Sequence, residues 1–136
     1  MSDISKDIAI TIGKLTSLVE YPIRTLVKDA DRLGADLKQN RLETNQVRKF
    51  LDAINRIKAD LIDETTEDKD RFKKIEVDII LLKPKLAYAA ARQQAAKPLQ
   101  EVLDAAIDRV ESMPDFERLV QLVESIIAYH KAAGGK

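Results

Sequence analysis

Few residues of this sequence have side chains that commonly carry out chemistry. The chain has no cysteine and one histidine, His130. Disulfides, thiolate nucleophiles and metal sites built from two histidines are therefore excluded. No glycine-rich phosphate loop follows a strand-like segment. We expect no catalytic residue, metal or cofactor, although a carboxylate-only metal site within the acidic stretch 60–70 stays open as an alternative.

The single histidine has two interpretations. His130 is in register with the apolar Ile126 and Ile127 on the last expected helix. It is either a hydrogen-bonded side chain at the edge of the core, near a helix C-terminus, or a general base or RNA contact. A general base needs a nucleophile beside it. The pattern supplies none, so we favour the structural interpretation.

Basic residues at helical spacing are more informative. A helix over residues 44–61 would have an exposed face opposite its apolar stripe, because successive residues turn by about 100°. The residues on that face are Arg48, Lys49, Asp52, Asn55 and Arg56. Two interpretations stay open for it. It is a solvated surface with ion pairs between residues four apart, or a basic face that contacts phosphates.

A second cationic strip lies between residues 83 and 92. Lys85, Tyr88 and Arg92 are spaced i, i+3 and i+7, so they share one helix face, and Lys83 lies just before Pro84. No acidic residue occurs between residues 79 and 100. The cations could neutralise phosphates while Tyr88 stacks or forms a hydrogen bond with sugar or phosphate. Alternatively, Tyr88 is a core residue with a wet hydroxyl, and the cations serve solubility.

Charge is sorted along the chain. The formal net charge is zero, which taken alone argues against a nucleic-acid-binding protein. However, residues 60–70 hold six acids against one lysine, and residues 101–124 hold seven acids against two arginines. Such sorting can leave a basic face on a neutral protein. We expect the acidic stretch 63–70 to form an exposed loop.

Composition predicts an all-α protein, a compact bundle of five to six helices forming a single domain over residues 1–136. Charged residues make up 34% of the chain and aromatic residues only 4%, which favours helices over a sandwich or barrel. No stretch is long and apolar enough to span a membrane. The N-terminus resembles neither a signal nor a transit peptide, so we expect a cytoplasmic protein.

Apolar residues spaced by three and four define the first three expected helices. Stripes run over residues 4–19 and 23–37, with Pro22 in the first turn of the second stripe. Whether these are two helices or one kinked helix stays open. The third helix covers residues 44–61, with Thr44 as its N-cap.

Prolines and small residues mark the remaining helices. The fourth runs over about residues 72–94 and should be kinked or broken near Pro84, which lacks a backbone donor. Pro98 begins the fifth helix. Ser112 is the expected N-cap of the sixth, which ends at residues 134–135, a glycine pair.

Three segments together resemble the small subunit of type III-A CRISPR effector complexes, the Csm family. They are QVRKFLDAINRIK (46–58), LLKPKLAYAAARQ (81–93) and VESIIAYHKAAGG (123–135). The resemblance covers roughly residues 41–136, the expected RNA-binding body. Residues 1–40 have no family motif and are expected to form N-terminal helices outside it.

The resemblance implies a non-catalytic protein of the prokaryotic cytoplasm. Copies of it would stack in a ribonucleoprotein filament beside a large signalling subunit and a repeating backbone subunit that carries the guide RNA. It would hold the guide RNA and target RNA through phosphate and sugar, independent of sequence. The expected contacts are Arg48, Lys49, Arg56, Lys83, Lys85 and Arg92, with Tyr88 from the strip above. Lys131 and His130 are weaker candidates, which could instead serve packing or contacts between subunits.

Two other functions stay open. The chain could be a helical structural adaptor that makes only protein–protein contacts through its apolar and acidic surfaces. It could also be a nuclease using acidic residues and a divalent metal, although the acids lie on an expected loop and define no site geometry.

Overall fold

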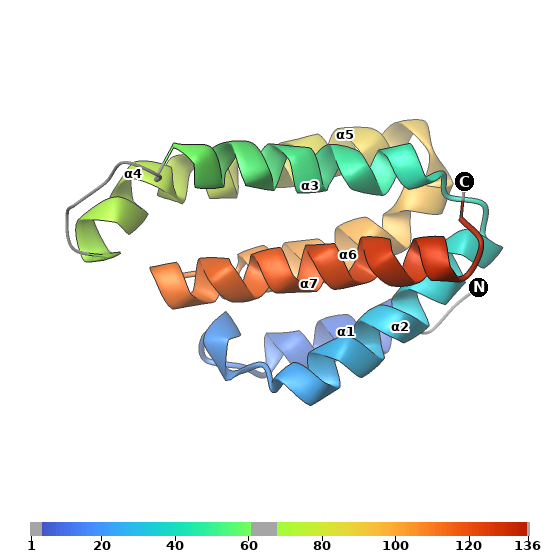
Figure 1. Ribbon diagram of the computed structural model, residues 1–136, viewed down its shortest axis with the longest axis horizontal. Helices are drawn as coiled ribbons and strands as arrows, with labels where there is room; N and C mark the ends of the chain where they lie inside the picture. Colours follow the sequence, from blue (N-terminus) through green and yellow to red (C-terminus); the bar gives the residue numbers. More distant parts are fainter. Residues whose placement is uncertain (1–3, 61–67, 136) are drawn as a thin grey trace.

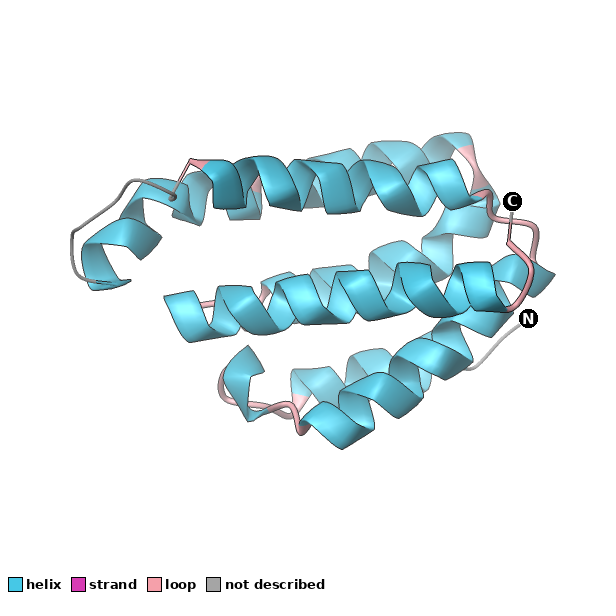
Figure 2. Ribbon diagram, in the orientation of Figure 1, coloured by secondary structure: helices cyan, strands magenta, loops and turns pink. Residues whose placement is uncertain are grey.

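The computed structural model describes residues 4–60 and 68–135, and all regular structure within those ranges is helical (Figure 2). Two short 3-10 helices, η1 (Leu18–Glu20) and η2 (Gln94–Ala96), precede α2 and α6. The α-helices are α1 (Ile4–Gly13), α2 (Ile23–Gln39), α3 (Thr44–Ala59), α4 (Asp68–Ile80), α5 (Leu82–Arg92), α6 (Lys97–Ile107) and α7 (Met113–Ala132). The expectation of an all-α bundle is confirmed, with six helices when α4 and α5 are counted as one bent helix.

The helices form three layers (Figure 1). α6 and α7 make the middle layer, with α1 and α2 on one side and α3, α4 and α5 on the other. Each middle helix contacts both outer layers: α7 packs on α2 and α3, and α6 packs on α1 and α5. For this reason α7 buries ten of its 20 residues. Among the described helices, none is long and apolar enough to cross a membrane.

The N-terminal region forms two separate helices rather than one kinked helix. α1 ends at Gly13, so the predicted continuation of this helix to Val19 is wrong, and Val19 lies exposed in η1. The chain after α1 is fixed to the segment that follows α6. The guanidinium of Arg109 donates to the Gly13 carbonyl at 2.8 Å, and the Leu18 N–H donates to the Arg109 carbonyl at 2.8 Å. These contacts between distant segments override the local apolar pattern.

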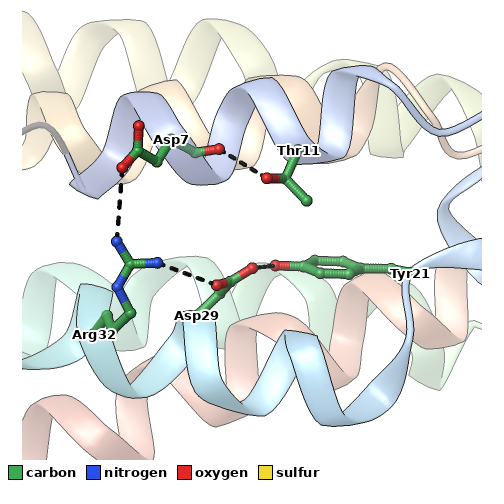
Figure 3. A network of polar contacts seen from close by, with 5 residues as sticks. All are labelled: Asp7, Thr11, Tyr21, Asp29 and Arg32. Carbon is green, nitrogen blue, oxygen red and sulfur yellow. Dashed lines mark hydrogen bonds and ion pairs between the residues drawn. The ribbon is translucent and has the colours of Figure 1, made fainter.

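A polar network joins η1, α2 and α1 (Figure 3). The hydroxyl of the buried Tyr21 donates to Asp29 at 2.5 Å. Arg32 lies 3.5 Å from Asp29 and 3.8 Å from Asp7, so it connects α2 to α1. Burial and the Asp29 carboxylate both raise the pKa of Tyr21, because each disfavours the phenolate. The network thereby holds the neutral tyrosine in place.

Two of the predicted helix starts are displaced by one residue. Pro22 lies just before α2 with extended backbone, rather than within its first turn. Glu43, not Thr44, precedes α3. The Thr44 side chain does not cap the helix, because its hydroxyl is hydrogen-bonded to His130 of α7 at 3.2 Å. Pro98 lies in the first turn of α6, as predicted.

Pro84 is associated with the predicted kink. α4 ends at Ile80, α5 begins at Leu82, and the helix axis is bent by 21°. Pro84 lies in the first turn of α5 and has no N–H to donate to the Ile80 carbonyl four residues earlier. The proline therefore interrupts the hydrogen-bond ladder at the bend.

The outer boundaries of this bent helix differ from the expected ones. It begins at Asp68 rather than near residue 72, so residues 68–70 are helical and not part of a loop. The rest of the expected loop, residues 63–67, lies outside the described residues. The helix ends at Arg92, two residues early, because Gln93 adopts extended backbone before η2.

The start of α7 matches the expectation. Ser112 has extended backbone, and its hydroxyl accepts a hydrogen bond from the Asp115 N–H at 3.3 Å. The buried Asp115 carboxylate accepts in turn from the Val19 N–H at 2.7 Å and from the Glu111 N–H at 2.9 Å. One side chain therefore connects the start of α7 to η1, in the neighbouring layer.

Candidate nucleic-acid interface

A groove of about 260 Å³ lies between α3 and α5. Its apolar floor comes from Phe50, which is 7% exposed, and from Ala53 and Ala89. Phe50 and Ala53 belong to α3, and Ala89 belongs to α5. The groove exists because α3 and α5 turn small or buried side chains toward one another and longer polar ones outward. It is lined by Gln46, Lys49, Phe50, Ala53, Lys85, Tyr88, Ala89, Arg92 and Gln93.

Among the residues that the structure describes, every charged side chain lining this groove is a cation. Lys49 comes from α3, Lys85 and Arg92 come from α5, and all three are exposed. Four other hollows on the described surface each have at least one carboxylate in their lining. No described acidic residue lines this groove, so the positive charges of its lining can attract an anion.

Tyr88 and Arg92 form a pair at the edge of the groove. The Arg92 guanidinium lies 5.6 Å from the centroid of the Tyr88 ring, and its Nη1 donates to the tyrosine hydroxyl at 3.4 Å. Tyr88 is 65% exposed, so it is not the core residue of the alternative interpretation. A contact of this kind between a cation and an exposed aromatic ring is weakly stabilising and places the two groups side by side at the surface.

The other basic residues of α3 lie beyond the groove. Arg56 is seven residues after Lys49, which places the two on nearly the same side of the helix, about 20° apart. Arg56 therefore extends the cationic line along α3 without lining the groove. Arg48 is about 100° around the helix from Lys49, on a different side. Both arginines are exposed, as expected for this face.

Lys83 does not share the surface of Lys85. Its ammonium group lies 2.5 Å from the carboxylate of Asp108, just after α6. The hydrogen bond to Asp108 is the main cause that raises the pKa of Lys83. Two residues of helix rotate a side chain by about 200°, which explains why Lys83 faces α6 while Lys85 faces α3. The expectation that no acid neutralises this strip locally is therefore wrong for Lys83.

The third segment of the family resemblance, residues 123–135, is not part of the groove. Lys131 is exposed in the last turn of α7 and does not line the groove, so its contact with RNA stays a prediction. His130 is completely buried. Its Nε2 lies 2.6 Å from the Leu42 carbonyl, which can only accept, and its Nδ1 faces Thr44. This geometry supports the structural interpretation of the histidine.

The glycine pair after α7 encloses this histidine. Gly134 has a φ of 98°. The Gly134 N–H donates to the Lys131 carbonyl, and the Gly135 N–H to the His130 carbonyl, both at 2.9 Å, which is the double hydrogen bond typical of a glycine C-cap. A Cβ on Gly135 would lie 2.2 Å from the His130 ring. The expected helix end is confirmed, and it also covers the buried ring.

Sequence reasoning missed two amide side chains of the groove, Gln46 and Gln93. Gln46 is three residues before Lys49, so helical spacing could have identified it. Gln93 gives no such signal, because it follows the helix in extended backbone. Within the described residues, no group of three histidine, cysteine, aspartate or glutamate side chains could hold a metal ion. The acidic stretch that left a metal site open lies largely outside them.

Fold and groove together define a class of protein: a small three-layered helical bundle with a cation-lined groove on one outer layer. The chain belongs to the Csm2 Type III-A family, whose family model matches residues 20–136. It is therefore a subunit of the type III-A CRISPR Csm complex. The match begins at the end of η1, so it includes α2 as well as the later helices. A search of curated proteins found no match to the chain.

Proposed function

We propose that this chain is a non-catalytic subunit that holds guide RNA and target RNA by their backbone, through the groove between α3 and α5. One observation supports this above all: Lys49, Lys85 and Arg92 come from two helices, yet line one groove in which none of the described lining residues is acidic. In this proposal residues 41–136 form the RNA-binding body, and α1 and α2 support it from the opposite layer.

Backbone contacts suit a protein that has to accept any guide. In RNA-guided systems sequence is read by base pairing, and the protein reads charge and shape. Lysine and arginine attract phosphates whatever the base, and exposed side chains reach them without a change in fold. Partners in the same assembly would be the large signalling subunit, the repeating backbone subunit and further copies of this chain.

The salt dependence of RNA binding tests this function. If roughly three to five phosphates are contacted, log affinity for single-stranded RNA should fall against log salt with a slope of about −2 to −3.5. The variant Lys85→Glu with Arg92→Glu should bind RNA more weakly, by about 1–3 kcal/mol for each critical contact, and with a shallower slope. Arg24→Glu with Lys28→Glu in α2 is the control matched in charge, since both residues are exposed and α2 lies in the opposite layer.

Two results would contradict the proposal. One is an affinity that does not change with salt, and the other is an equal loss in the α2 control. The absence of an enzymatic role has its own test. Labelled RNA incubated with the purified chain and Mg²⁺ or Mn²⁺ should stay intact, and cleavage that needs acidic residues of this chain would overturn the non-catalytic assignment.

The second candidate function, a structural adaptor, is favoured by a different surface. Val77, Ile80 and Leu81 at the bend between α4 and α5 are 63%, 53% and 50% exposed. They are spaced i, i+3 and i+4, so they share one helix face, and exposed apolar groups of this kind often contact other proteins. An adaptor and an RNA-binding subunit differ in one outcome: only the second loses RNA when Lys85 and Arg92 are reversed in charge.

A further inference from the structure

The groove between α3 and α5 combines features that a simple phosphate track does not need. It has an apolar floor at Phe50, Ala53 and Ala89, and an exposed aromatic ring at Tyr88. Phosphates gain nothing from either, because they interact with charge and hydrogen-bond donors. Nucleobases do, since every base has a flat π-face that stacks on aromatic side chains.

The size of the groove limits what can enter. Its volume of about 260 Å³ is just below the roughly 300–1,000 Å³ of pockets that bind drug-sized molecules. One flat ring system with part of its sugar fits such a space, whereas several adjacent nucleotides do not. The groove therefore matches a single base rather than a stretch of strand.

The side chain of Tyr88 is exposed and accessible to a stacking ligand. Arg92 contacts both its ring, at 5.6 Å from the centroid, and its hydroxyl, at 3.4 Å, while 65% of the residue stays exposed. Because most of the residue is exposed, a base can reach the ring without any rearrangement of the core. The guanidinium also remains a donor for a phosphate next to the stacked base.

The polar lining suits any base. Gln46 and Gln93 line the groove, and each amide has a donor and an acceptor. Such a group can pair with the polar edge of any base by reversing its orientation. An acidic peptide would use Lys49, Lys85 and Arg92 but would need neither the tyrosine nor the apolar floor.

We propose that this groove receives one unpaired nucleobase of RNA, stacked on Tyr88 with its polar edge at Gln46 or Gln93, while Lys49, Lys85 and Arg92 hold the flanking phosphates. This inference rests on the proposed function, because RNA has to reach the groove before a base can enter it. Selection among bases is weak, since stacking and amide pairing accept all four.

The experiment uses the full chain and two single-stranded RNAs of equal length. One is oligouridine with a central 2-aminopurine, a base whose fluorescence falls when it stacks. The other has abasic residues in place of the central nucleotides. The wild-type chain should bind the first RNA about 5- to 100-fold more tightly than the second. The 2-aminopurine fluorescence should fall on binding.

Variants separate stacking from charge. Tyr88→Ala should bind both RNAs equally and leave the fluorescence unchanged, whereas Tyr88→Phe should behave like the wild type. Ile23→Ala, an exposed apolar residue of α2 in the opposite layer, is the matched control and should change nothing. Tyr88→Ala should fold normally, because the side chain is mostly exposed.

The other outcomes distinguish this inference from the proposed function. Equal, salt-dependent binding of both RNAs by the wild type would overturn base insertion and leave backbone binding standing. A wild type that binds neither RNA would overturn both. Binding of an oligoglutamate peptide that is lost in the Lys85→Glu with Arg92→Glu variant, with no binding of RNA, would assign the groove to an acidic protein segment and also overturn both.

Discussion

His130 shows how a residue that could do chemistry is used for structure. Its ring lies where the start of α3 meets the end of α7, between Leu42, Thr44 and Gly135. The Leu42 carbonyl at 2.6 Å from Nε2 requires that nitrogen to be the donor, so in the neutral ring Nδ1 accepts from the Thr44 hydroxyl. Both nitrogens are engaged, and the side chain is 0% exposed.

We expect His130→Ala to destabilise the protein strongly. The change leaves a cavity and deprives two buried polar groups of their partner, at a cost of about 2–5 kcal/mol in the free energy of unfolding. Urea unfolding followed by circular dichroism measures this. Lys131→Ala, one residue further and exposed, is the control and should change stability by no more than about 0.5 kcal/mol. Equal stability of the two variants would refute the structural role.

This residue also marks a limit of sequence reasoning. Spacing placed His130 on the same side as Ile126 and Ile127, which is correct, since all three are buried. It could not reveal Thr44 as the partner, because the two residues are 86 positions apart and belong to different helices. For the same reason Thr44 looked like an N-cap. The same limit applies to Lys83 at the surface. Its salt bridge to Asp108, a residue 25 positions away, removes one cation from the expected strip.

At the scale of elements, the close contact of α2 and α7 depends on a glycine. A Cβ on Gly34 would lie 2.7 Å from the backbone nitrogen of His130 and 2.9 Å from the carbonyl carbon and Cβ of Tyr129. Backbone atoms cannot yield as a flexible side chain can, so the helices themselves would have to separate. The middle layer is therefore positioned by the absence of a side chain.

Gly34→Ala should accordingly destabilise the bundle, although alanine is the better helix former. Overpacking of this kind costs about 1–3 kcal/mol. Gly13→Ala is the matched comparison, because nothing lies within 4 Å of its added Cβ and its φ is not positive. It should be neutral or stabilising by up to about 1 kcal/mol. Thermal unfolding of both variants checks this, and a gain in stability for Gly34→Ala would contradict the packing described.

The connection between η1 and α2 should make stability depend on alkaline pH. Tyrosine in an unfolded chain loses its proton near pH 10, whereas burial and Asp29 raise the pKa of Tyr21 in the folded protein. Its contribution is fully present below about pH 10 and declines above it, because only the unfolded chain releases the proton easily. The loss approaches about 1.4 kcal/mol per pH unit.

Tyr21→Phe removes this dependence. The free energy of unfolding should be measured in urea between about pH 9 and pH 11 for both proteins, since tyrosine in an unfolded chain titrates near pH 10. The wild-type stability should fall more steeply with pH than that of the variant, and the other titrating groups are common to both. Parallel curves would show that the tyrosine is not held neutral by the fold.

The positions of the helices were the most predictable feature of this protein. Periodic apolar residues identified every long helix, and Pro84 and Ser112 marked a bend and a cap through local chemistry. The errors that can be traced involve distant partners. The stripe of the first helix continues to Val19, but the helix ends at Gly13, whose carbonyl accepts a hydrogen bond from Arg109, 96 positions away. Periodicity reports what a segment can bury and not which distant segment interrupts it.

At the scale of the whole molecule, the three layers separate two surfaces. The cationic groove lies on the outer layer of α3 and α5, and α1 and α2 cover the opposite side of the middle layer (Figure 1). A protein with zero net charge can thus have a positively charged surface on one layer. Sequence alone suggested that the cations of two motifs share a surface, and the structure brings Lys49, Lys85 and Arg92 to one groove. The sequence could not predict the groove itself, which depends on how α3 packs beside α5.

Reversing the charge of the groove should weaken RNA retention by the complex without affecting its assembly. We expect a type III-A complex reconstituted with Lys85→Glu and Arg92→Glu to contain the chain in its usual amount but to hold target RNA less tightly. Both side chains are exposed and neither belongs to the core, so folding should be unaffected. Gel filtration with quantification of protein and RNA measures both quantities. Unchanged RNA retention in a fully assembled complex would favour the adaptor function.

The most direct test of the central claim is site-specific photocrosslinking in the assembled complex. A photoreactive amino acid placed at position 85 faces the groove, and the same group at position 28 lies in the opposite layer. If the groove holds RNA, irradiation should attach the chain to guide or target RNA from position 85 and not from position 28. Crosslinks from position 85 to protein alone, with RNA absent, would contradict the account.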